Sequence, residues 1–432
     1  MTREPHVPSY YAASVEPPPE RPALGGDLRV DVCVVGAGFT GLSAALELAE
    51  RGYRVAVLEA RRVCWGASGR NGGQIGSAYP RGMAWLGRWV GEDDASRLFA
   101  LAEAAKALIR HRVDRYAIAC ELKPGCFHAA TKARHMAEIR RTRALWAETY
   151  GYQGLALAES GEAARGYVNS PRYIGGLYDA GAGHLHPLKY GLGLAAAAEA
   201  AGAVLYEGSP VIALAGLRAG DRHTAAQTPG GRVVADHLIL CGNAYLGDLV
   251  PEIRRAYAPV GSYIVATEPL GAERAAQVIP ADCAAFDSNH ILNYYRLSAD
   301  GRLLFGGRTE TSPFREPDPR AFLGARIREL FPQIADARLD YAWGGRLAMT
   351  YSRMPQVGRL GARVSFAHGY SGEGVAMSGL LGEILAEAVA GQLERFDAFA
   401  RLPHRAFPGG RALQKPALIL GLLWYRLCDL MP

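Results

Sequence analysis

The sequence predicts an α/β protein, α+β overall, with one domain built on a parallel sheet and a second built on an antiparallel sheet plus helices. Two strand–glycine turn–helix units, beginning at Val30 and at Val364, predict the first domain. Short alternating segments between Ala258 and Trp343 predict the second, because alternation with a period of two is typical of strands. The two glycine units lie near opposite ends of the chain, so the parallel-sheet domain is expected to be discontinuous.

The first unit, "RVDVCVVGAGFTGLSAALELAERGYRVAVLEA", predicts a Rossmann-like βαβ segment that binds a dinucleotide. Val30 to Val35 and Val55 to Leu58 have the unbroken hydrophobicity of buried parallel strands. In the turn between them, Gly36 permits the tight bend and Gly38 lets backbone N–H groups reach a phosphate. Gly41 allows close packing of helix and strand, so the positive end of the helix faces the pyrophosphate.

An acidic residue, Glu59, ends the second strand of this unit. It lies 18 residues beyond the last glycine (59 − 41), where a carboxylate is expected to accept the ribose hydroxyls of an adenosine. A carboxylate there repels a 2′-phosphate, which argues against NADP. NAD and FAD both remain compatible with the first unit.

A second glycine-rich loop, "GASGRNGGQ" from Gly66 to Gln74, follows closely. It offers many backbone donors with little side-chain bulk, which suits a long flat ligand such as the remaining pyrophosphate and a flavin ring. We therefore expect FAD, with Asn71, Gly72 and Gly73 nearest the reactive ring. The alternative is a flexible surface loop. Arg70 has three possible roles at this point: pairing with phosphate, facing the substrate pocket, or bracing the loop.

The C-terminal unit repeats the strand–turn–helix pattern. Val364 to Ala367 predicts a strand, His368 to Gly374 a glycine turn, and Val375 to Val389 a helix whose N-terminus points at the N1–C2=O edge of the flavin. In the middle of the chain, a helix from about Pro187 to Ala201 precedes a strand that contains Val211, near the adenine. The buried strand in "RVVADHLILCGNAY" is expected to end near the pyrophosphate at Gly242, and both strands extend the parallel sheet.

These elements predict a division into domains. Residues 1–27 form an N-terminal arm that wraps the body or stays loose, and residues 401–432 form a tail with an apolar helix. The FAD-binding domain comprises 28–80, 155–250 and 345–400, whereas the substrate domain comprises the mostly helical 81–154 and the antiparallel 251–344. The "SADGR" segment in the latter has the Asp-Gly of a hairpin turn.

Composition narrows the classes of partner and compartment. The formal net charge is +6, but lysine occurs only at positions 106, 123, 132, 189 and 415, and no basic run stands out, so no nucleic acid partner is expected. Seven cysteines without CxxC or zinc-like spacing predict reduced thiols, a cytoplasmic location and no metal site. No secretion signal or transmembrane segment is predicted. The apolar C-terminal helix fits packing or an interface better than contact with a membrane surface.

The quoted segments resemble the FAD-dependent D-amino-acid-oxidase-like amine oxidoreductases, and they look most like the bacterial gamma-glutamylputrescine oxidase branch. Further matching segments are "SYYAAS", "GHLHPLKYGLGLA", "NYYRLSADGRLLFGGRT", "WGGRLAMTYSRMPQVG", "GYSGEGVAMSG" and "FPGGRALQKPALILGLLWYRL". The resemblance covers nearly the whole chain. It implies FAD contacts at Gly36, Gly38, Gly41, Glu59, Arg61, Ser68, Asn71, Gly72, Gly73, Val211, Gly372, Gly374 and Val375.

The sequence departs at three positions from the pattern of the family that it resembles. Glu373 stands where a histidine is expected, beside the pyrimidine edge of the flavin. Leu347 and Leu304 stand where sarcosine oxidase relatives carry a flavin-linked cysteine and an oxygen-activating lysine. The resemblance therefore implies non-covalent FAD, and it leaves open whether O2 or another electron acceptor reoxidises it.

Candidates for the substrate pocket come from the antiparallel region and its surroundings. Arg296 and Arg308 flank the Asp-Gly hairpin, where a guanidinium could bind a substrate carboxylate. Tyr294 and Tyr295 alternate on one strand, so one of them is expected to face the pocket. Further candidates, each with a structural role as the alternative, are His184 with its neighbour His186, Arg346 and Arg353.

The predicted activity is oxidation of the C–N bond of an amine or amino acid, either gamma-glutamylputrescine-like or N-substituted. Hydride transfer to the flavin gives an imine, which hydrolyses. The alternatives are an NAD-dependent dehydrogenase, a tRNA-modifying relative of the same FAD fold, and a binding protein that merely retains FAD. The oligomeric state and the identity of the amine stay open.

Overall fold

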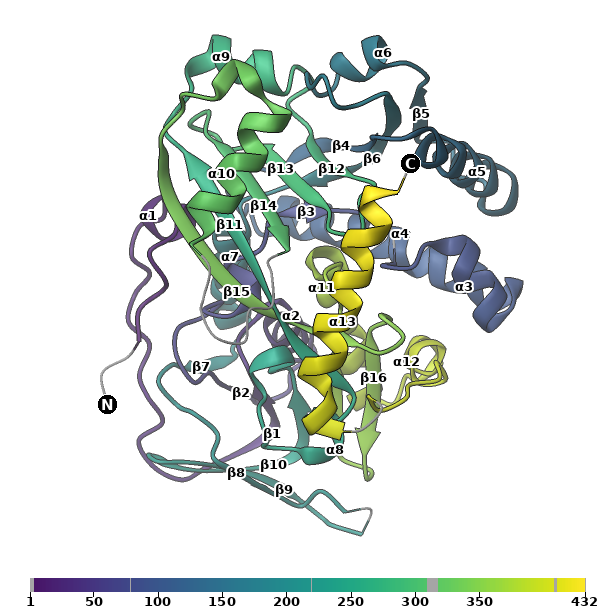
Figure 1. Ribbon diagram of the computed structural model, residues 1–432. Coiled ribbons are helices and arrows are strands. Elements are labelled where there is room, and N and C mark those ends of the chain that lie inside the picture. The colour runs from purple at the N-terminus through teal and green to yellow at the C-terminus, as the bar shows by residue number, and fades with distance from the viewer. Residues whose placement is uncertain (1–3, 78, 219, 309–317, 408–409, 432) are drawn as a thin grey trace.

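Both sheets predicted from the sequence are present in the computed structural model (Figure 1), but the second is antiparallel except where β12 (Ala284–Asp287) and β4 (Lys123–Ala130) pair in parallel. The structure describes residues 4–431 apart from 78, 219, 309–317 and 408–409.

The first sheet has eight strands and forms the floor of the nucleotide-binding region. Its order is β16-β17-β10-β1-β2-β7, and β9 extends it by pairing with both β10 and β8. The strands from β17 to β7 run parallel, as the sequence predicts, whereas β16 and β9 are antiparallel to their neighbours. The strands are β1 (Leu28–Val35), β2 (Val55–Leu58), β7 (Val204–Tyr206), β8 (Ala213–Ala215), β9 (Thr224–Thr228), β10 (Gly231–Leu240), β16 (Gln356–Leu360) and β17 (Val364–His368). Val211 follows β7 in an irregular segment, outside the strand in which it was expected.

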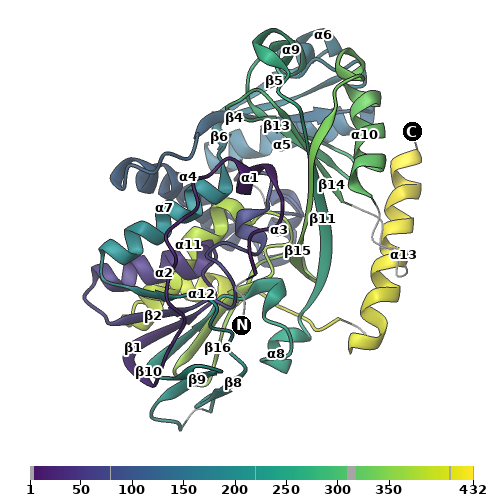
Figure 2. The same ribbon diagram turned by 90° about the vertical axis from the view of Figure 1, so that its left-hand side faces the viewer.

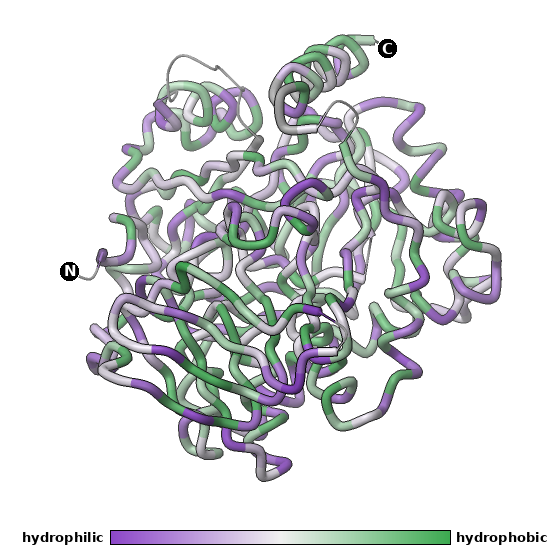
Figure 3. The backbone as a smooth tube through the Cα atoms, turned by 90° about the horizontal axis from the view of Figure 1, so that it is seen from below, coloured by the Kyte–Doolittle hydropathy of each residue, from purple (hydrophilic) through white to green (hydrophobic). Residues whose placement is uncertain are grey.

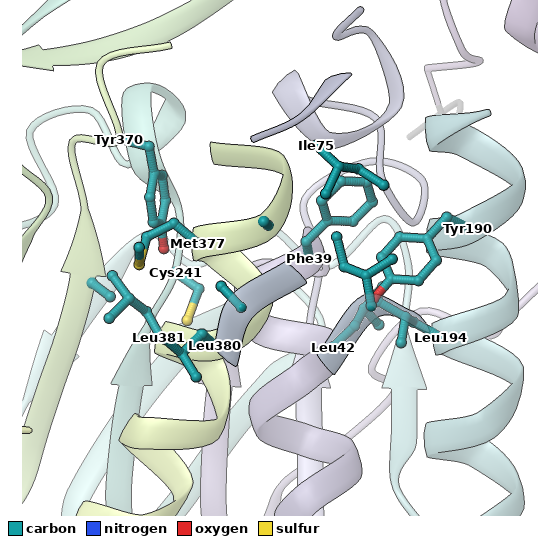
Figure 4. Close-up of a cluster of buried hydrophobic side chains, with 14 of the residues drawn as sticks. Phe39, Leu42, Ile75, Tyr190, Leu194, Cys241, Tyr370, Met377, Leu380 and Leu381 are labelled. Carbon is teal, nitrogen blue, oxygen red and sulfur yellow. The ribbon is translucent and has the colours of Figure 1, made fainter. Parts of the chain in front are cut away.

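Three helices pack together above this sheet. They are α2 (Phe39–Glu50), α7 (Pro187–Ala200) and α11 (Gly374–Val389), in agreement with the predicted helices. Figure 4 shows how Leu42 of α2 lies between Tyr190 of α7 and Leu380 of α11 in the buried core. The three helices therefore pack on one hydrophobic core, although they come from distant parts of the chain.

The second sheet has nine strands in the order β15-β11-β14-β13-β12-β4-β6-β3, with β5 paired to β6. The Asp-Gly hairpin is confirmed between β13 and β14, with Gly301 at φ +75°. The strands are β3 (Gln74–Ile75), β4 (Lys123–Ala130), β5 (Leu155–Ala158), β6 (Gly175–His184), β11 (Tyr257–Thr267), β12 (Ala284–Asp287), β13 (Asn293–Leu297), β14 (Leu303–Arg308) and β15 (Leu339–Thr350).

The predicted domain division agrees with this sheet only in part. The stretch 81–154 is mostly helical, as expected, and its strand β4 joins the sheet of the substrate domain. By contrast, β3, β5, β6 and the end of β15 lie in stretches that were assigned to the FAD-binding domain. The segment "GGLYDAGAGH" of β6 is rich in glycine and has a weak strand propensity of its own. Pairing with β4 and β5 overrides that propensity, because sheet formation depends strongly on neighbouring strands.

The remaining helices surround the second sheet and the ends of the first (Figure 2). They are α3 (Met83–Val90), α4 (Glu92–Arg115), α5 (Ala133–Tyr150), α6 (Gly161–Arg165), α8 (Pro251–Arg254), α9 (Gly271–Val278), α10 (Pro319–Leu330) and α12 (Glu394–Ala400), with short 3₁₀ turns η1 (Ala67–Gly69), η2 (Asn243–Tyr245) and η3 (Pro332–Ile334).

The described part of the N-terminal arm, from residue 4 onward, packs against the body of the protein rather than remaining loose. Its short helix α1 (Tyr10–Ala13) buries Tyr11 completely, and the hydroxyl of Tyr10 donates to Asp300 at 2.8 Å. Arg21 pairs with Glu199 at 2.7 Å. The arm thus joins the hairpin of the second sheet to a helix of the first domain.

The C-terminal helix α13 (Gly410–Leu430) lies along the outside of the molecule (Figures 1 and 2). One face packs inward, where Gln414 donates to the carbonyl of Tyr257 at 3.3 Å. The opposite face carries exposed Leu420, Trp424 and Leu427, and Figure 3 shows the apolar turns near the C-terminal end. Within the described ranges, no single helix is long and apolar enough to cross a membrane. Helices α11 and α12 together reach that length and apolar composition, but the chain bends sharply between them.

Candidate active site

The first glycine turn brings the N-terminus of α2 against the end of β1. A Cβ at Gly41 would lie 1.9 Å from the carbonyl oxygen of Gly36, so only glycine allows the helix to pack this closely. Gly36 and Gly38 line a large cavity at the turn, whereas Gly41 does not. Gly41 therefore acts through packing, and the other two present backbone to a ligand.

Glu59 stands at the end of β2 and lines the same cavity. Its Oε2 accepts the backbone N–H of Ala37 and its Oε1 accepts that of Arg61, both at 2.9 Å. Burial raises the pKa of this carboxyl above its ordinary value. These bonds hold the carboxylate beside the first turn, at the position predicted for the ribose contact.

The second glycine loop is held against the first turn by hydrogen bonds of its own side chains. The hydroxyl of Ser68 accepts the N–H of Phe39 at 3.0 Å, which joins the loop to the start of α2. The side-chain amide of Asn71 donates to the carbonyl of Ala67 at 3.0 Å and accepts the N–H of Gly73 at 2.8 Å. Asn71 thereby fixes the shape of the loop, and both Ser68 and Asn71 line the cavity.

Arg70 mainly braces this loop. Its Nε donates to the carbonyl of Trp65 at 2.6 Å, and its Nη1 donates to the carbonyl of Gly344 in β15 at 3.1 Å. The guanidinium lies 3.8 Å from the centroid of the Trp65 ring. Burial lowers the pKa of Arg70, and its buried Nη2 has no partner among the described residues. Since Arg70 lines the cavity, this remaining donor is available to an anionic ligand.

The turn before α11 forms another wall of the cavity. Gly372, Gly374 and Val375 line it together with Tyr370, whose hydroxyl shares a hydrogen bond of 2.6 Å with Thr40 Oγ1. This bond ties the turn to α2. Two glycine turns from opposite ends of the chain therefore face one space, and the dipoles of both helices favour negative charge there.

The cavity has a volume of about 1510 Å³, larger than the roughly 300–1,000 Å³ of an ordinary small-molecule site. Its first half has the donors that FAD needs: exposed turn backbone, Arg70 Nη2 and the Ser378 hydroxyl, for which the described part of the chain provides no partner. The residues present therefore fit FAD and leave space for a second ligand. The expected cofactor residues that line it are Gly36, Gly38, Glu59, Arg61, Ser68, Asn71, Gly72, Val211, Gly242, Gly372, Gly374 and Val375; Gly41 and Gly73 do not.

The second half of the cavity is walled by the nine-stranded sheet and by helices α3, α5 and α13. Tyr294 lines it, and its hydroxyl shares a hydrogen bond of 3.0 Å with Ser262. Tyr295 points into the core instead, where its hydroxyl donates to Tyr173 at 2.7 Å and its ring stacks on Phe305. The alternation along β13 is thus as expected, but the pocket candidate is Tyr294 rather than Tyr295.

Arg296 does not line the cavity, contrary to the expectation that it contacts substrate. It is 1% exposed, and its Nε donates to the carbonyl of Gly72 at 2.8 Å. Its Nη2 donates to the hydroxyl of Tyr11 at 3.3 Å. Arg296 therefore contacts both the second glycine loop, through Gly72, and the N-terminal arm, through Tyr11. It supports the loop from the side opposite the cavity.

The other pocket candidates have different outcomes. His184 is buried outside the cavity lining, its Nε2 lies 3.1 Å from the carbonyl of Asp282, and burial lowers its pKa to about 3. Arg346 lines the cavity with an exposed side chain, and Arg353 lines it too. The backbone of Arg308 pairs with Ser262, while its side chain lies outside the described residues.

Two titratable side chains in the second half were not found by sequence reasoning. His128 shares a hydrogen bond of 2.8 Å with Ser288 and stacks on Phe286, and burial lowers its pKa to about 4. Asp287 accepts the side-chain amide of Asn293 at 2.6 Å, and burial raises its pKa to about 6. Both line the cavity. For Asp287, the sequence did offer an indication, because polar residues follow an apolar strand pattern in the segment "FDSN". Among the described residues, no group of His, Cys, Asp and Glu could hold a metal.

Comparisons with known proteins agree with this geometry. Residues 31–388 match the model of the DAO family, described as FAD dependent oxidoreductase. The chain is 40% identical over 428 residues to gamma-glutamylputrescine oxidoreductase of Escherichia coli (strain K12), which covers 98% of each protein. The crystal structure of glycine oxidase from Geobacillus kaustophilus is similar with a TM-score of 0.69 at 24% identity, covering 85% of this chain and 98% of that chain. The structure of L-proline dehydrogenase from P. horikoshii has a TM-score of 0.71 at 18% identity, covering 87% and 96%.

Proposed function

Because this chain belongs to the DAO family of FAD-dependent oxidoreductases, we propose that it oxidises a C–N bond of gamma-glutamylputrescine or a closely similar amine. One observation carries the proposal: a single cavity contains both glycine turns and, beyond them, a chamber lined by Tyr294, Leu292 and Phe286. A cofactor and a substrate can therefore meet in one enclosed space. The likeness to the Escherichia coli enzyme over 98% of both chains supports the choice of amine.

The first half of the cavity holds FAD without a covalent bond. Glu59 and the backbone at Gly36 to Gly38, which line this half, would hold the adenosine and pyrophosphate, and Arg70 and the turn before α11 would lie along the remainder. Leu347, which lines the cavity, offers no thiol for a covalent link. When bound, FAD supplies the acceptor for the hydride that leaves the carbon next to the substrate nitrogen.

The residues of the second half orient the amine and limit water around it. Apolar side chains such as Leu177, Phe286 and Leu292 form its walls, and His128 with a pKa of about 4 stays neutral at pH 7. A neutral imidazole adds no further positive charge to the cavity, which arginines also line. Loss of a hydride and a proton converts the amine to an imine, and water then cleaves the imine to an aldehyde and ammonia.

O2 or another acceptor would reoxidise the bound FAD, and we place the enzyme in the cytoplasm. All seven cysteines are unpaired, which is consistent with a reducing compartment. The NAD-dependent alternative loses its support, because the matching family uses FAD. No described feature favours the tRNA-modifying alternative or the binding-protein alternative over amine oxidation.

Anaerobic mixing with a panel of amines tests the substrate. Gamma-glutamylputrescine is expected to bleach the flavin absorbance completely and fastest, ahead of putrescine, sarcosine and glycine. Faster reduction by one of the three simpler amines would contradict the proposed substrate while leaving amine oxidation in place. If none of the four reduced the flavin, the proposed activity itself would be wrong.

A further inference from the structure

Arginines contribute several of the side chains that line the cavity, and one of these, Arg61, pairs with Glu4. Elsewhere, arginines commonly pair with carboxylates, as Arg112 does with Glu47 at 3.0 Å and Arg302 with Asp340 at 2.6 Å. Among the described residues, a set of cavity-lining arginines has no carboxylate partner: Arg81, Arg88, Arg141, Arg346 and Arg353. Unpaired cations gathered around one concave wall attract anions. Of these five arginines, Arg353 is half-buried and the other four are exposed.

Arg353 is the most constrained of this set. It lies in the turn after β15 with φ +63°, a conformation that non-glycine residues rarely adopt and that clusters at functional sites. Its Nη2 donates to the hydroxyl of Tyr425 at 2.8 Å, and its guanidinium carbon lies 5.2 Å from the centroid of the Tyr425 ring. Burial is the largest cause that lowers the pKa of Arg353, and Arg81 also lowers it. The turn therefore holds a partly desolvated cation in the cavity wall beside a second cation.

Tyr425 reaches this position because the inner face of α13 is anchored to the loop before β13. Asp429 accepts the backbone N–H of His290 at 2.8 Å and that of Ile291 at 3.0 Å. The ring of His290 stacks on Tyr425 with centroids 5.1 Å apart. Tyr425, His290 and Arg353 all line the cavity, so the C-terminal helix contributes to the same wall.

We propose that Arg353, oriented by Tyr425 and flanked by Arg81, binds a carboxylate carried by the amine substrate. A guanidinium has five N–H donors in a planar fork, and the single bond to Tyr425 leaves donors for a bidentate carboxylate. The carboxylate would offset the cost of holding an unpaired cation away from water. This subsite rests on the proposed function, because it deepens the choice of substrate to amines with an anionic group.

Equilibrium binding to the FAD-loaded protein tests the subsite without turnover. Glutarate, a dicarboxylate without an amine, is the probe, and perturbation of the flavin absorbance is the readout. We expect Arg353→Gln to weaken glutarate binding about 10- to 100-fold, the range for loss of a charge-assisted hydrogen-bonded pair. Arg353→Lys is expected to restore part of the affinity, since it keeps the charge but not the fork. Glutaramide, the neutral analogue, is expected to bind wild type and variant equally weakly.

Arg401→Gln is the matched control, because it removes the same charge from an exposed position, 71% exposed at the end of α12, outside the cavity lining. It is expected to leave glutarate binding unchanged. Equal glutarate affinity in wild type and Arg353→Gln, or equal loss in Arg353→Gln and Arg401→Gln, would overturn the subsite. If Arg353→Gln did not fold, Tyr425→Phe would decide: it keeps the stacked ring, and we expect affinity to fall about 3- to 10-fold.

A kinetic comparison separates this subsite from the proposed function. With gamma-glutamylputrescine, Arg353→Gln is expected to raise KM about 10- to 100-fold with little change in kcat, as loss of uniform binding does. With N-(4-aminobutanoyl)putrescine, which lacks only the carboxylate, the variant and the wild type are expected to have equal KM. A parallel change for both amines would overturn the subsite. If neither amine reduced the flavin but glutarate binding still depended on Arg353, the activity would be wrong and the anion subsite would stand.

Discussion

The two halves of the cavity are built from different parts of the polypeptide. The cofactor half consists mainly of backbone at turns, such as Gly36 to Gly38 and Gly372 to Gly374, each held by residues close in sequence or by one crossing bond. The substrate half consists of side chains from a nine-stranded sheet and from helices α3, α5 and α13. Backbone sites follow from local spacing, whereas side-chain sites depend on which distant elements meet.

Two arginines make the same comparison at the level of single residues. Arg296 was expected at the substrate and is 1% exposed behind the second glycine loop, where it donates to Gly72. For Arg353, the sequence left a pocket role and a structural role equally open, and the structure places it in the cavity lining beside Tyr425. The same type of side chain thus supports the cofactor half from behind, whereas in the substrate half it is a half-buried cation in the cavity wall.

The largest effect is expected from a substitution in the cofactor half of the cavity. Gly41→Ala places a Cβ 1.9 Å from the carbonyl oxygen of Gly36, so α2 must shift away from β1. We expect a loss of about 3 kcal/mol in the free energy of unfolding, typical of overpacking at a site that cannot relax, together with weaker FAD binding. Thermal unfolding and FAD titration measure both.

The control for this substitution is Gly87→Ala in α3, where a Cβ meets nothing within 4 Å. Because alanine is a better helix former than glycine, the control is expected to stabilise the protein by about 0.5–1 kcal/mol. Equal effects of the two substitutions would show that close packing at the first turn has no special importance.

Arg296→Met sharpens the contrast between the two arginines. It removes the donors to Gly72 and Tyr11 from a buried position, so we expect a loss of about 2 kcal/mol in unfolding free energy. The ratio of KM values for gamma-glutamylputrescine and its decarboxylated analogue should stay at the wild-type value, unlike in Arg353→Gln. A collapse of that ratio in Arg296→Met would return Arg296 to the substrate site.

The smallest of these effects concerns pH and the substrate half. The pKa of Asp287 is raised by burial from 3.8 to about 6, so its contribution to stability is present below pH 3.8 and is lost as pH rises through 6. Relative to Asp287→Asn, the wild type should therefore lose about 2 kcal/mol of unfolding free energy between pH 4.5 and pH 7.5. Denaturant unfolding at both pH values measures this difference, and a pH-independent difference would show that the carboxyl is not buried in solution.

Sequence reasoning was most successful where short spacing determines structure. The strands before and after the first turn, the parallel sheet, the Asp-Gly hairpin and the helix after Gly374 follow from patterns within about 30 residues, the length of one βαβ unit. FAD also follows, since two glycine loops and Glu59 restrict the cofactor chemistry. These are local properties of the chain.

The substrate half was predicted less well because it depends on pairing between distant segments. β6 is a glycine-rich strand that gains its structure from β4 and β5, and nothing in its own composition indicates a strand strongly. Tyr294 and Tyr295 are neighbours with opposite fates, and only the sheet determines which one faces the cavity. The approach of Tyr425 to Arg353 joins positions 72 residues apart, beyond the reach of any sequence spacing.

Determination of the bound cofactor tests the central claim most directly. The purified protein is expected to absorb at about 450 nm, as bound oxidised flavin does, and to carry one FAD per chain. Acid precipitation should release that FAD into the supernatant, since no covalent bond holds it. A colourless protein that gains no flavin band on addition of FAD would contradict the account, and flavin that remained in the acid pellet would contradict its non-covalent attachment.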